Sequence, residues 1–162
     1  MSAYYFDASA VVKRYIDEPG SAWVRQVCLA RDQNALENFN YIAIGEITVA
    51  EVAAAFAVLV RRNVIPKRIG TRAYEKFISE FRDEYEIVQL TPTLILAAAQ
   101  LTQRYPLKAY DALQLALAMR ANDLLKANGL ALIFVAGDTP LLQAARAENL
   151  ITENPFDHTD LD

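Results

Sequence analysis

Four acidic residues lie far apart in the chain, and each borders a stretch that is otherwise apolar: Asp7, Glu51, Asp111 and Asp138. A lone carboxylate is costly to bury, so each must lie at the solvated end of an element, pair with another group or bind a cation. If the four side chains converge in space, their oxygens form a pocket suited to a hard divalent metal such as Mg2+ or Mn2+. The chemistry of this protein therefore depends on whether they meet.

Each acid also has a purely structural interpretation. Asp7 and Asp138 are placed to cap the helices expected after them. Thr48 and Glu51 have the spacing of a capping box, in which Glu51 would bond to the backbone amide of Thr48. Asp111 falls in the opening turn of a helix, where the macrodipole favours an anion. The structural and metal-binding interpretations are compatible, because helix amino ends can gather acids at one place.

Spacing alone leaves Glu46 as an alternative to Glu51. The chain has one histidine and one cysteine, which argues against a zinc site and against a Cys–His nucleophilic pair. His158 lies in a polar tail and is assigned no role, whereas Cys28 is expected to be a small buried core residue. No P-loop and no GxGxxG pattern occurs, which removes the simplest nucleotide-binding sites.

The composition is that of a globular protein. A chain of 162 residues, 54% hydrophobic and 22% charged, is most simply one domain. The Ala-rich stretch around Phe56 is interrupted by Glu51 and ended by Arg61-Arg62, so no membrane-spanning segment is expected. The first residues lack the layout of a signal peptide. We therefore expect a soluble, cytoplasmic protein.

The formal net charge is -4, from 16 basic and 20 acidic side chains. Removing the four candidate acids from the 20 leaves 16, so the rest of the molecule is formally neutral. An acidic total argues against a nonspecific nucleic-acid binder, but less so if the excess charge is concentrated in a metal pocket. Local basic clusters are either solvated helix surface or contacts for phosphate: Lys13-Arg14, Arg61-Arg62 with Lys67-Arg68, and Arg104 with Lys108.

Hydrophobic periodicity predicts strands that alternate with helices. Strands are expected over residues 3–6, 40–44, 86–90, 130–135 and 150–151. Helices are expected over residues 9–15, 21–30, 48–62, 66–84, 91–105, 108–128 and 139–148. This alternation predicts an α/β fold with a mostly parallel sheet covered on both faces. In such sheets ligands bind beyond the carboxyl ends of the strands, where Asp7 and Asp138 are expected. The domain should span residues 1–153, followed by an acidic tail over 154–162.

Five segments occur in a fixed order along the chain: Phe6-Asp7-Ala8-Ser9-Ala10-Val11-Val12-Lys13, Glu18-Pro19-Gly20-Ser21, Thr48-Val49-Ala50-Glu51-Val52, Ala109-Tyr110-Asp111-Ala112-Leu113-Gln114-Leu115-Ala116 and Phe134-Val135-Ala136-Gly137-Asp138. This ordered set resembles the signature blocks of PIN-domain ribonucleases, and most closely those of VapC-type toxins of prokaryotic toxin–antitoxin pairs. The resemblance covers nearly the whole chain. Each block is short, and the specificity comes from their order.

The resemblance selects Glu51 over Glu46, because only Glu51 falls in the Thr-x-x-Glu block. It implies a PIN-like three-layer α/β/α fold and a Mg2+- or Mn2+-dependent endoribonuclease. The implied catalytic residues are Asp7, Glu51, Asp111 and Asp138, with Asp7 and Asp111 as direct metal ligands.

The resemblance also bears on substrate binding. Ser9 matches the small hydroxyl residue that often follows the first Asp in the family, and we expect it to contact the substrate. Lys13, Arg14 and Lys108 lie close in sequence to the acidic blocks, and we expect them to contact phosphate groups of the RNA.

Two residues depart from the family pattern. Ala136 stands where many members place Ser or Thr, which removes one possible hydrogen bond near the last acid. Gln114 stands where His is common, and the sequence does not say with what consequence.

The VapC-type resemblance implies a cognate VapB-type antitoxin and a homodimer. Helix faces around Phe56, Val60, Phe77 and Phe81 are either surfaces for such association or core packing. Two other functions remain alternatives. One is a non-catalytic PIN-like module that binds RNA or protein. The other is a phosphatase of the haloacid-dehalogenase type, although that chemistry requires a second Asp at the position of Ser9.

Overall fold

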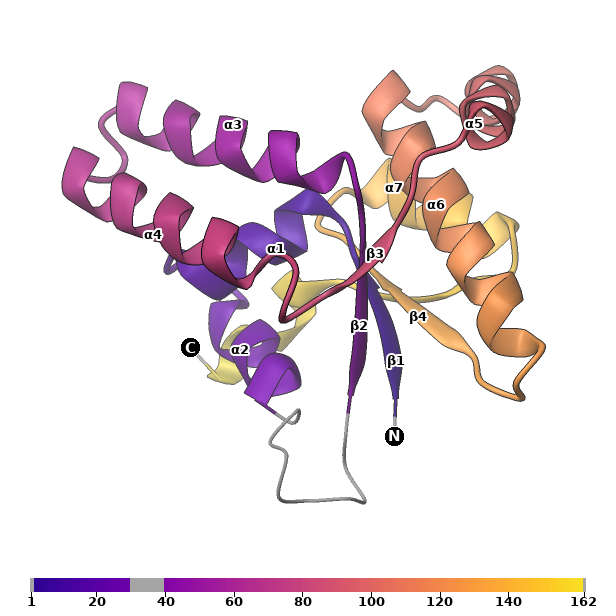
Figure 1. Ribbon diagram of the computed structural model, residues 1–162, viewed down its shortest axis with the longest axis horizontal. Coiled ribbons are helices and arrows are strands. Elements are labelled where there is room, and N and C mark those ends of the chain that lie inside the picture. Colours follow the sequence, from indigo (N-terminus) through magenta and orange to yellow (C-terminus); the bar gives the residue numbers. More distant parts are fainter. Residues whose placement is uncertain (1, 30–39, 162) are drawn as a thin grey trace.

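A parallel sheet forms the centre of the protein (Figure 1). The computed structural model describes residues 2–29 and 40–161. Within them the strands are β1 (Ala3–Phe6), β2 (Tyr41–Gly45), β3 (Glu86–Val88), β4 (Leu132–Val135) and β5 (Ile151–Glu153). Their order in the sheet is β3-β2-β1-β4-β5, and all neighbours are parallel. The chain therefore builds outward from β1 in one direction and from β4 in the other, so the winding reverses between these two strands.

Helices cover both faces of this sheet (Figure 1). One face carries α1 (Ala8–Tyr15), α2 (Ser21–Leu29), α3 (Thr48–Arg61) and α4 (Lys67–Glu80). The other face carries α5 (Pro92–Arg104), α6 (Ala109–Lys126) and α7 (Thr139–Ala147). A final 3-10 helix, η1 (Pro155–Leu161), packs against α2. The observed architecture is the predicted three-layer α/β/α fold.

The short strands are buried on both faces because alternate side chains enter different cores. Tyr5 of β1 packs among residues of α5, α6 and α7, whereas its neighbour Phe6 packs among residues of α1 to α4. Both side chains are fully buried. A strand covered on both faces is apolar along its whole length, which explains the continuous apolar runs in the sequence.

Every predicted strand and helix has a counterpart in the described residues, with shifts of a few residues at the ends. The largest shift concerns α4, which was expected to reach residue 84 and ends at Glu80, because the chain then turns and buries Tyr85 before β3. Residue 30, expected in the second helix, lies outside the described residues. Cys28 is buried, as predicted.

Of the two interpretations left open for the helix faces around Phe56 and Phe77, burial excludes the association surface for these two residues. Their side chains are 2% and 0% exposed, and their rings meet edge to face with centroids 6.4 Å apart. They hold the α3–α4 hairpin against α1, where Tyr15 packs on both rings. Core packing, the alternative interpretation, is therefore correct for these two residues.

The helices also bear on the expectation about membranes. Within the described part of the chain, none of them combines the length and the apolar character that a membrane crossing requires.

Candidate active site

Asp7 and Asp138 lie at the reversal point of the sheet. Asp7 directly follows β1 and caps α1, accepting the backbone N–H of Ala10 at 2.9 Å. Asp138 lies shortly after β4 and caps α7, accepting the N–H of Leu141 at 2.8 Å. The two strands are adjacent and parallel, so their carboxyl ends meet at one edge. The predicted caps and the predicted position at the strand ends are both confirmed.

Glu51 and Asp111 reach the same edge from the amino ends of two helices. Glu51 lies in the first turn of α3 and Asp111 in the first turn of α6. Both helices begin at the end of the sheet where β1 and β2 finish (Figure 1). Asp7 interacts electrostatically with Glu51 and with Asp111, and Asp111 interacts with Asp138. The structure therefore brings the four predicted acids together.

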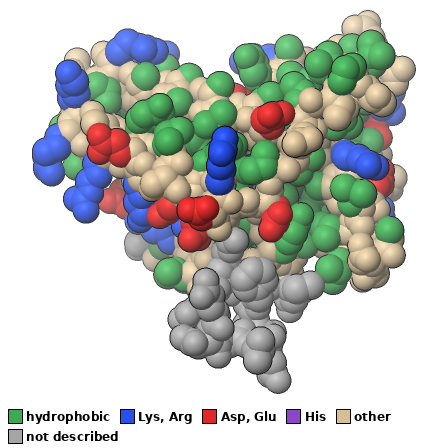
Figure 2. Space-filling view, viewed as in Figure 1, with side chains coloured by type: hydrophobic (Ala, Val, Ile, Leu, Met, Phe, Trp, Pro, Cys, Tyr) green, Lys and Arg blue, Asp and Glu red, His purple; other side chains and the backbone are tan. Residues whose placement is uncertain are grey.

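Exposure changes across this cluster. Asp7 is buried, Glu51 and Asp111 are partly buried, and Asp138 is exposed. The molecular surface is hollowed between the α3–α4 side and the α5–α6 side (Figure 2). The acids thus run from the interior to the solvent, which gives a ligand one side of approach.

Burial and mutual repulsion raise the pKa of three of these carboxyl groups. Burial raises the pKa of Asp7 from its ordinary 3.8 to about 6, against the lowering effect of its hydrogen bonds, and Asp111 raises it further. Burial raises the pKa of Glu51 from 4.5 to about 7, and Asp7 and Asp111 add to this. Burial also raises the pKa of Asp111, with a contribution from Asp138. Such a cluster is stabilised by a nearby positive charge.

The chain itself supplies little of that charge. Among the described residues, none of the four acids forms an ion pair with a Lys or Arg side chain. The donor set, carboxylate oxygens only, is the set that Mg2+ and Mn2+ prefer. Across the described ranges 2–29 and 40–161, no three His, Cys, Asp or Glu side chains are close enough to hold a metal ion as they stand. The oxygens of Asp7 and Glu51 are instead bonded to neutral groups of the protein.

Ser9 connects the two loops that carry the capping acids. Its hydroxyl donates to Oδ1 of Asp7 at 2.7 Å and accepts the backbone N–H of Gly137 at 2.9 Å. Together these two hydrogen bonds link the β1–α1 junction to the β4–α7 loop. The loop begins at Ala136, the position where the sequence lacks the hydroxyl residue expected from the resemblance. The hydroxyl is thus already used within the protein, and a contact of Ser9 with substrate stays a prediction.

Gln114 orients Glu51 through a buried hydrogen-bond network. Burial raises the pKa of Tyr5, whose hydroxyl stays protonated and donates to Oε1 of Gln114 at 2.6 Å. The amide Nε2 of Gln114 donates to Oγ1 of Thr48 at 2.9 Å and to Oε2 of Glu51. This residue was missed as a functional position, although a polar side chain inside the apolar run 112–118 was a usable signal.

The same network corrects the capping-box interpretation of Thr48 and Glu51. The residue before the helix is Ile47, whose side chain makes no capping hydrogen bond. Glu51 bonds to Gln114 instead of reaching back to the amide of Thr48. Glu46 is exposed and accepts the N–H of Leu90 at 3.2 Å, a contact that involves none of the four acids.

Two of the three cations expected to contact phosphate are engaged inside the protein. Lys13 is 2% exposed and pairs with Glu18 at 3.2 Å. The guanidinium of Arg14 pairs with Glu80, the last residue of α4, at 3.0 Å and with Glu84 in the following turn at 3.3 Å. Lys108 is exposed and interacts electrostatically with Asp111, so it is the cation that the structure leaves beside the acids.

The family comparison agrees with this geometry. The model of the PIN domain matches residues 4–138, which is most of the chain and includes all four acids. The chain belongs to the PIN-domain family. No curated protein matches it by sequence.

Solved structures share the fold of this PIN domain. FitAcB from Neisseria gonorrhoeae has a TM-score of 0.60 at 19% identity, covering 94% of this chain and 98% of that chain. PAE2754 from Pyrobaculum aerophilum has a TM-score of 0.59 at 16% identity, covering 98% and 88%. VapBC2 from Rickettsia felis, solved bound to a DNA fragment from its promoter, has a TM-score of 0.57 at 19% identity, covering 94% and 98%. At these identities the likeness establishes the fold.

The raised pKa of Asp7 predicts how stability depends on pH in the metal-free protein. A carboxyl group whose pKa is higher in the folded state stabilises the fold below its unfolded pKa, near 3.8, and this contribution is lost as the pH rises through about 6. Asp7→Asn keeps the Oδ1 acceptor and removes the charge. In EDTA, its free energy of unfolding relative to wild type should rise by about 2 to 3 kcal/mol between pH 4 and pH 8. Urea denaturation at both pH values tests this. An equal difference at pH 4 and pH 8 would contradict it.

The buried network predicts coupling between Tyr5 and Gln114. Gln114→Leu leaves the Tyr5 hydroxyl without an acceptor and should lower the free energy of unfolding by about 2 kcal/mol. Tyr5→Phe in the same protein removes that unpaired hydroxyl, so the double variant should lose less than the sum of the single variants. Urea denaturation of the four proteins at one pH measures the coupling. Strictly additive losses would show that the hydroxyl and the amide do not interact.

Proposed function

We propose that this PIN-domain protein is a Mg2+- or Mn2+-dependent endoribonuclease, and the toxin of a VapC-type toxin–antitoxin pair. The observation that carries the proposal is the cluster of four carboxylates at the reversal point of the sheet, without an ion-paired cation from the described chain. The PIN-domain family consists of nucleases, which supports hydrolysis of phosphodiester bonds. The choice of RNA as substrate and the dependence on metal belong to the proposal.

In this proposal Asp7 and Asp111 hold the metal directly, and Glu51 and Asp138 complete the pocket. A bound divalent cation offsets the negative charge of the phosphate and lowers the pKa of a coordinated water. The protein's own contribution is positional. Gln114 holds the carboxylate of Glu51, and the helix caps hold those of Asp7 and Asp138.

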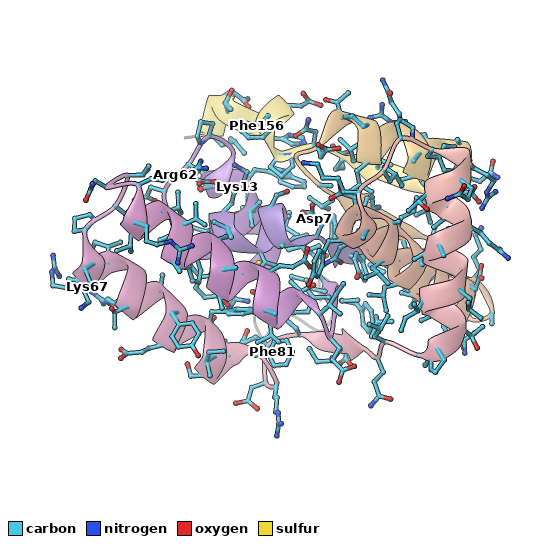
Figure 3. The ribbon with its side chains drawn as sticks, turned by 90° about the horizontal axis from the view of Figure 1, so that it is seen from above. Asp7, Lys13, Arg62, Lys67, Phe81 and Phe156 are labelled. Carbon is cyan, nitrogen blue, oxygen red and sulfur yellow. The ribbon has the colours of Figure 1, made fainter. Side chains whose placement is uncertain are left out.

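The end of the α3–α4 hairpin provides a surface for the RNA backbone. No acidic residue occurs between Glu51 and Glu75, whereas five cations do, all of them exposed and without an ion pair among the described residues. These residues, which we name the basic hairpin end, are Arg61, Arg62, Lys67, Arg68 and Arg72. Lys and Arg side chains gather over this side of the molecule (Figure 2), and Arg62 and Lys67 lie at its tip (Figure 3).

Helix α3 connects this surface to the acids, with Glu51 in its first turn and Arg61 as its last residue. An RNA strand bound at the acid cluster can therefore continue along α3 to the basic hairpin end. Nonspecific nucleic-acid binding depends on cations that contact phosphate groups. Lys108 remains the proposed phosphate contact at the acids themselves. Ser9, Lys13 and Arg14 remain proposed contacts only if RNA displaces their present partners.

The proposed toxin role includes a VapB-type antitoxin as partner, a homodimer and action in the cytoplasm. The support is that the similar structures include VapBC2 and FitAcB. The family match sets aside the phosphatase alternative. A non-catalytic PIN-like module is the remaining alternative, and the retained set of four acids favours catalysis over it.

Asp7→Asn should abolish metal-dependent cleavage while the protein stays folded. Wild type is expected to cleave labelled RNA with Mg2+ or Mn2+ and to stop in EDTA, and the variant should be slower by on the order of 100-fold or more. Glu46→Gln is the matched control, because it removes an exposed carboxylate outside the cluster and should cleave like wild type. Undiminished cleavage by Asp7→Asn would remove Asp7 from the mechanism.

Neutralising the basic hairpin end should weaken RNA binding and flatten its salt dependence. The double change Arg62→Gln and Lys67→Gln, made in Asp7→Asn to prevent cleavage, should reduce the slope of log K against log salt by roughly 0.7 for each phosphate group that is no longer neutralised. Arg120→Gln with Lys126→Gln removes two exposed cations from α6 and serves as control. Fluorescence anisotropy with single-stranded RNA at several salt concentrations gives both slopes. Equal slopes in the two double variants would rule out the hairpin as the contact.

A further inference from the structure

An open cavity of about 440 Å³ adjoins the acid cluster. It is lined by residues of α1, α3, η1 and the α1–α2 loop, and two of them, Ser9 and Glu51, also belong to the acid site. Its size falls within the range of about 300 to 1,000 Å³ that is typical of small-molecule pockets. Whatever occupies this cavity therefore lies directly beside the proposed reaction centre.

The cavity joins an apolar wall to an ion pair whose more exposed member is the acceptor. The apolar lining comes from Ala8, Val12, Ala55, Val58, Leu59 and Phe156. The polar lining includes the paired side chains of Lys13 and Glu18, whose Nζ and Oε2 are 3.2 Å apart. Two carboxylates in the lining, those of Glu18 and Glu51, disfavour a phosphate here, so the cavity suits a neutral and partly apolar group.

Phe156 is the aromatic element of this cavity, and it is 47% exposed. The ammonium of Lys13 lies over its ring, 4.1 Å from the centroid (Figure 3). A methyl group at Gly137, beside Asp138, would approach the ring edge to 3.0 Å. The preceding residue, Pro155, is equally confined, because a methyl group at Gly20 would come within 2.2 Å of its carbonyl oxygen. The C-terminal 3-10 helix thus holds a half-exposed aromatic ring at the edge of the acid site.

We propose that this cavity binds a nucleobase of the RNA next to the scissile phosphate, with Phe156 as its stacking platform. This rests on the proposed nuclease function. A base has a flat apolar face and an edge that carries donors, which matches the ring, the apolar wall and the carboxylate of Glu18, the more exposed member of the Lys13–Glu18 pair. Single-stranded RNA is commonly recognised through bases that stack on aromatic side chains. The phosphate attached to the base is then directed toward the acids, which share Ser9 and Glu51 with the cavity.

The test compares three RNA oligonucleotides: an intact strand, and two strands in which one abasic nucleotide lies on one or the other side of the mapped cleavage site. Wild type should cleave the intact strand about tenfold faster than one of the abasic strands, because stacking of a base on an aromatic ring strengthens binding by about that factor. Phe156→Leu should lose this preference, and Phe156→Tyr should keep it. Tyr74→Leu removes an exposed aromatic side chain outside the cavity and should behave as wild type. Thermal unfolding of each variant shows whether η1 packing is kept.

Binding gives a readout that does not depend on cleavage. In the Asp7→Asn background the intact strand should bind about tenfold more tightly than the same abasic strand, and adding Phe156→Leu should remove the difference. Equal binding of all strands, or a preference that survives Phe156→Leu, overturns the nucleobase site, and leaves an apolar side chain of a protein partner as the occupant. Absence of any metal-dependent cleavage by wild type would instead overturn the proposed function.

Discussion

Repulsion among partly buried carboxylates is the constraint on which the site depends. Asp7 is held at the reversal point of the sheet, where burial raises its pKa to about 6, and it stays there because the N–H of Ala10 and the hydroxyl of Ser9 bond to its oxygen. Glu51 is held in the same way by the amide of Gln114. Neutral donors orient these charges without cancelling them, so the cluster retains its attraction for a cation.

The helix amino ends explain how four such groups can occupy one edge of the fold. The first turns of α3 and α6 and the capping positions of α1 and α7 all carry an acid, where the N–H groups and the helix dipole favour negative charge. The parallel sheet then aligns these ends on one side. The same interactions that stabilise the helices therefore assemble the site, and the structural and catalytic interpretations of the acids describe one arrangement.

The distribution of charge is compatible with the RNA binding that we propose for this acidic protein. A net charge of -4 would oppose a polyanion if it were spread evenly. Here negative charge is concentrated in the acid cluster, and the basic hairpin end is positive and free of acidic neighbours in sequence. The C-terminal helix η1 is held in place by His158. The ring of His158 stacks on Trp23 with centroids 4.3 Å apart, and its Nε2 is hydrogen-bonded to Glu153 at 3.0 Å. His158, given no role from the sequence, thus helps to position Phe156.

The sequence by itself determined the alternation of strands and helices and the position of each acid at the end of an element. These features follow from hydrophobic periodicity and from capping, which act over a few residues. Only the tertiary structure decided that Glu51 bonds to Gln114, that Arg14 forms an ion pair with Glu80 of α4, and that Phe56 and Phe77 are buried. Each of these contacts joins segments distant in sequence, and their partners become known only when the helices pack onto the sheet.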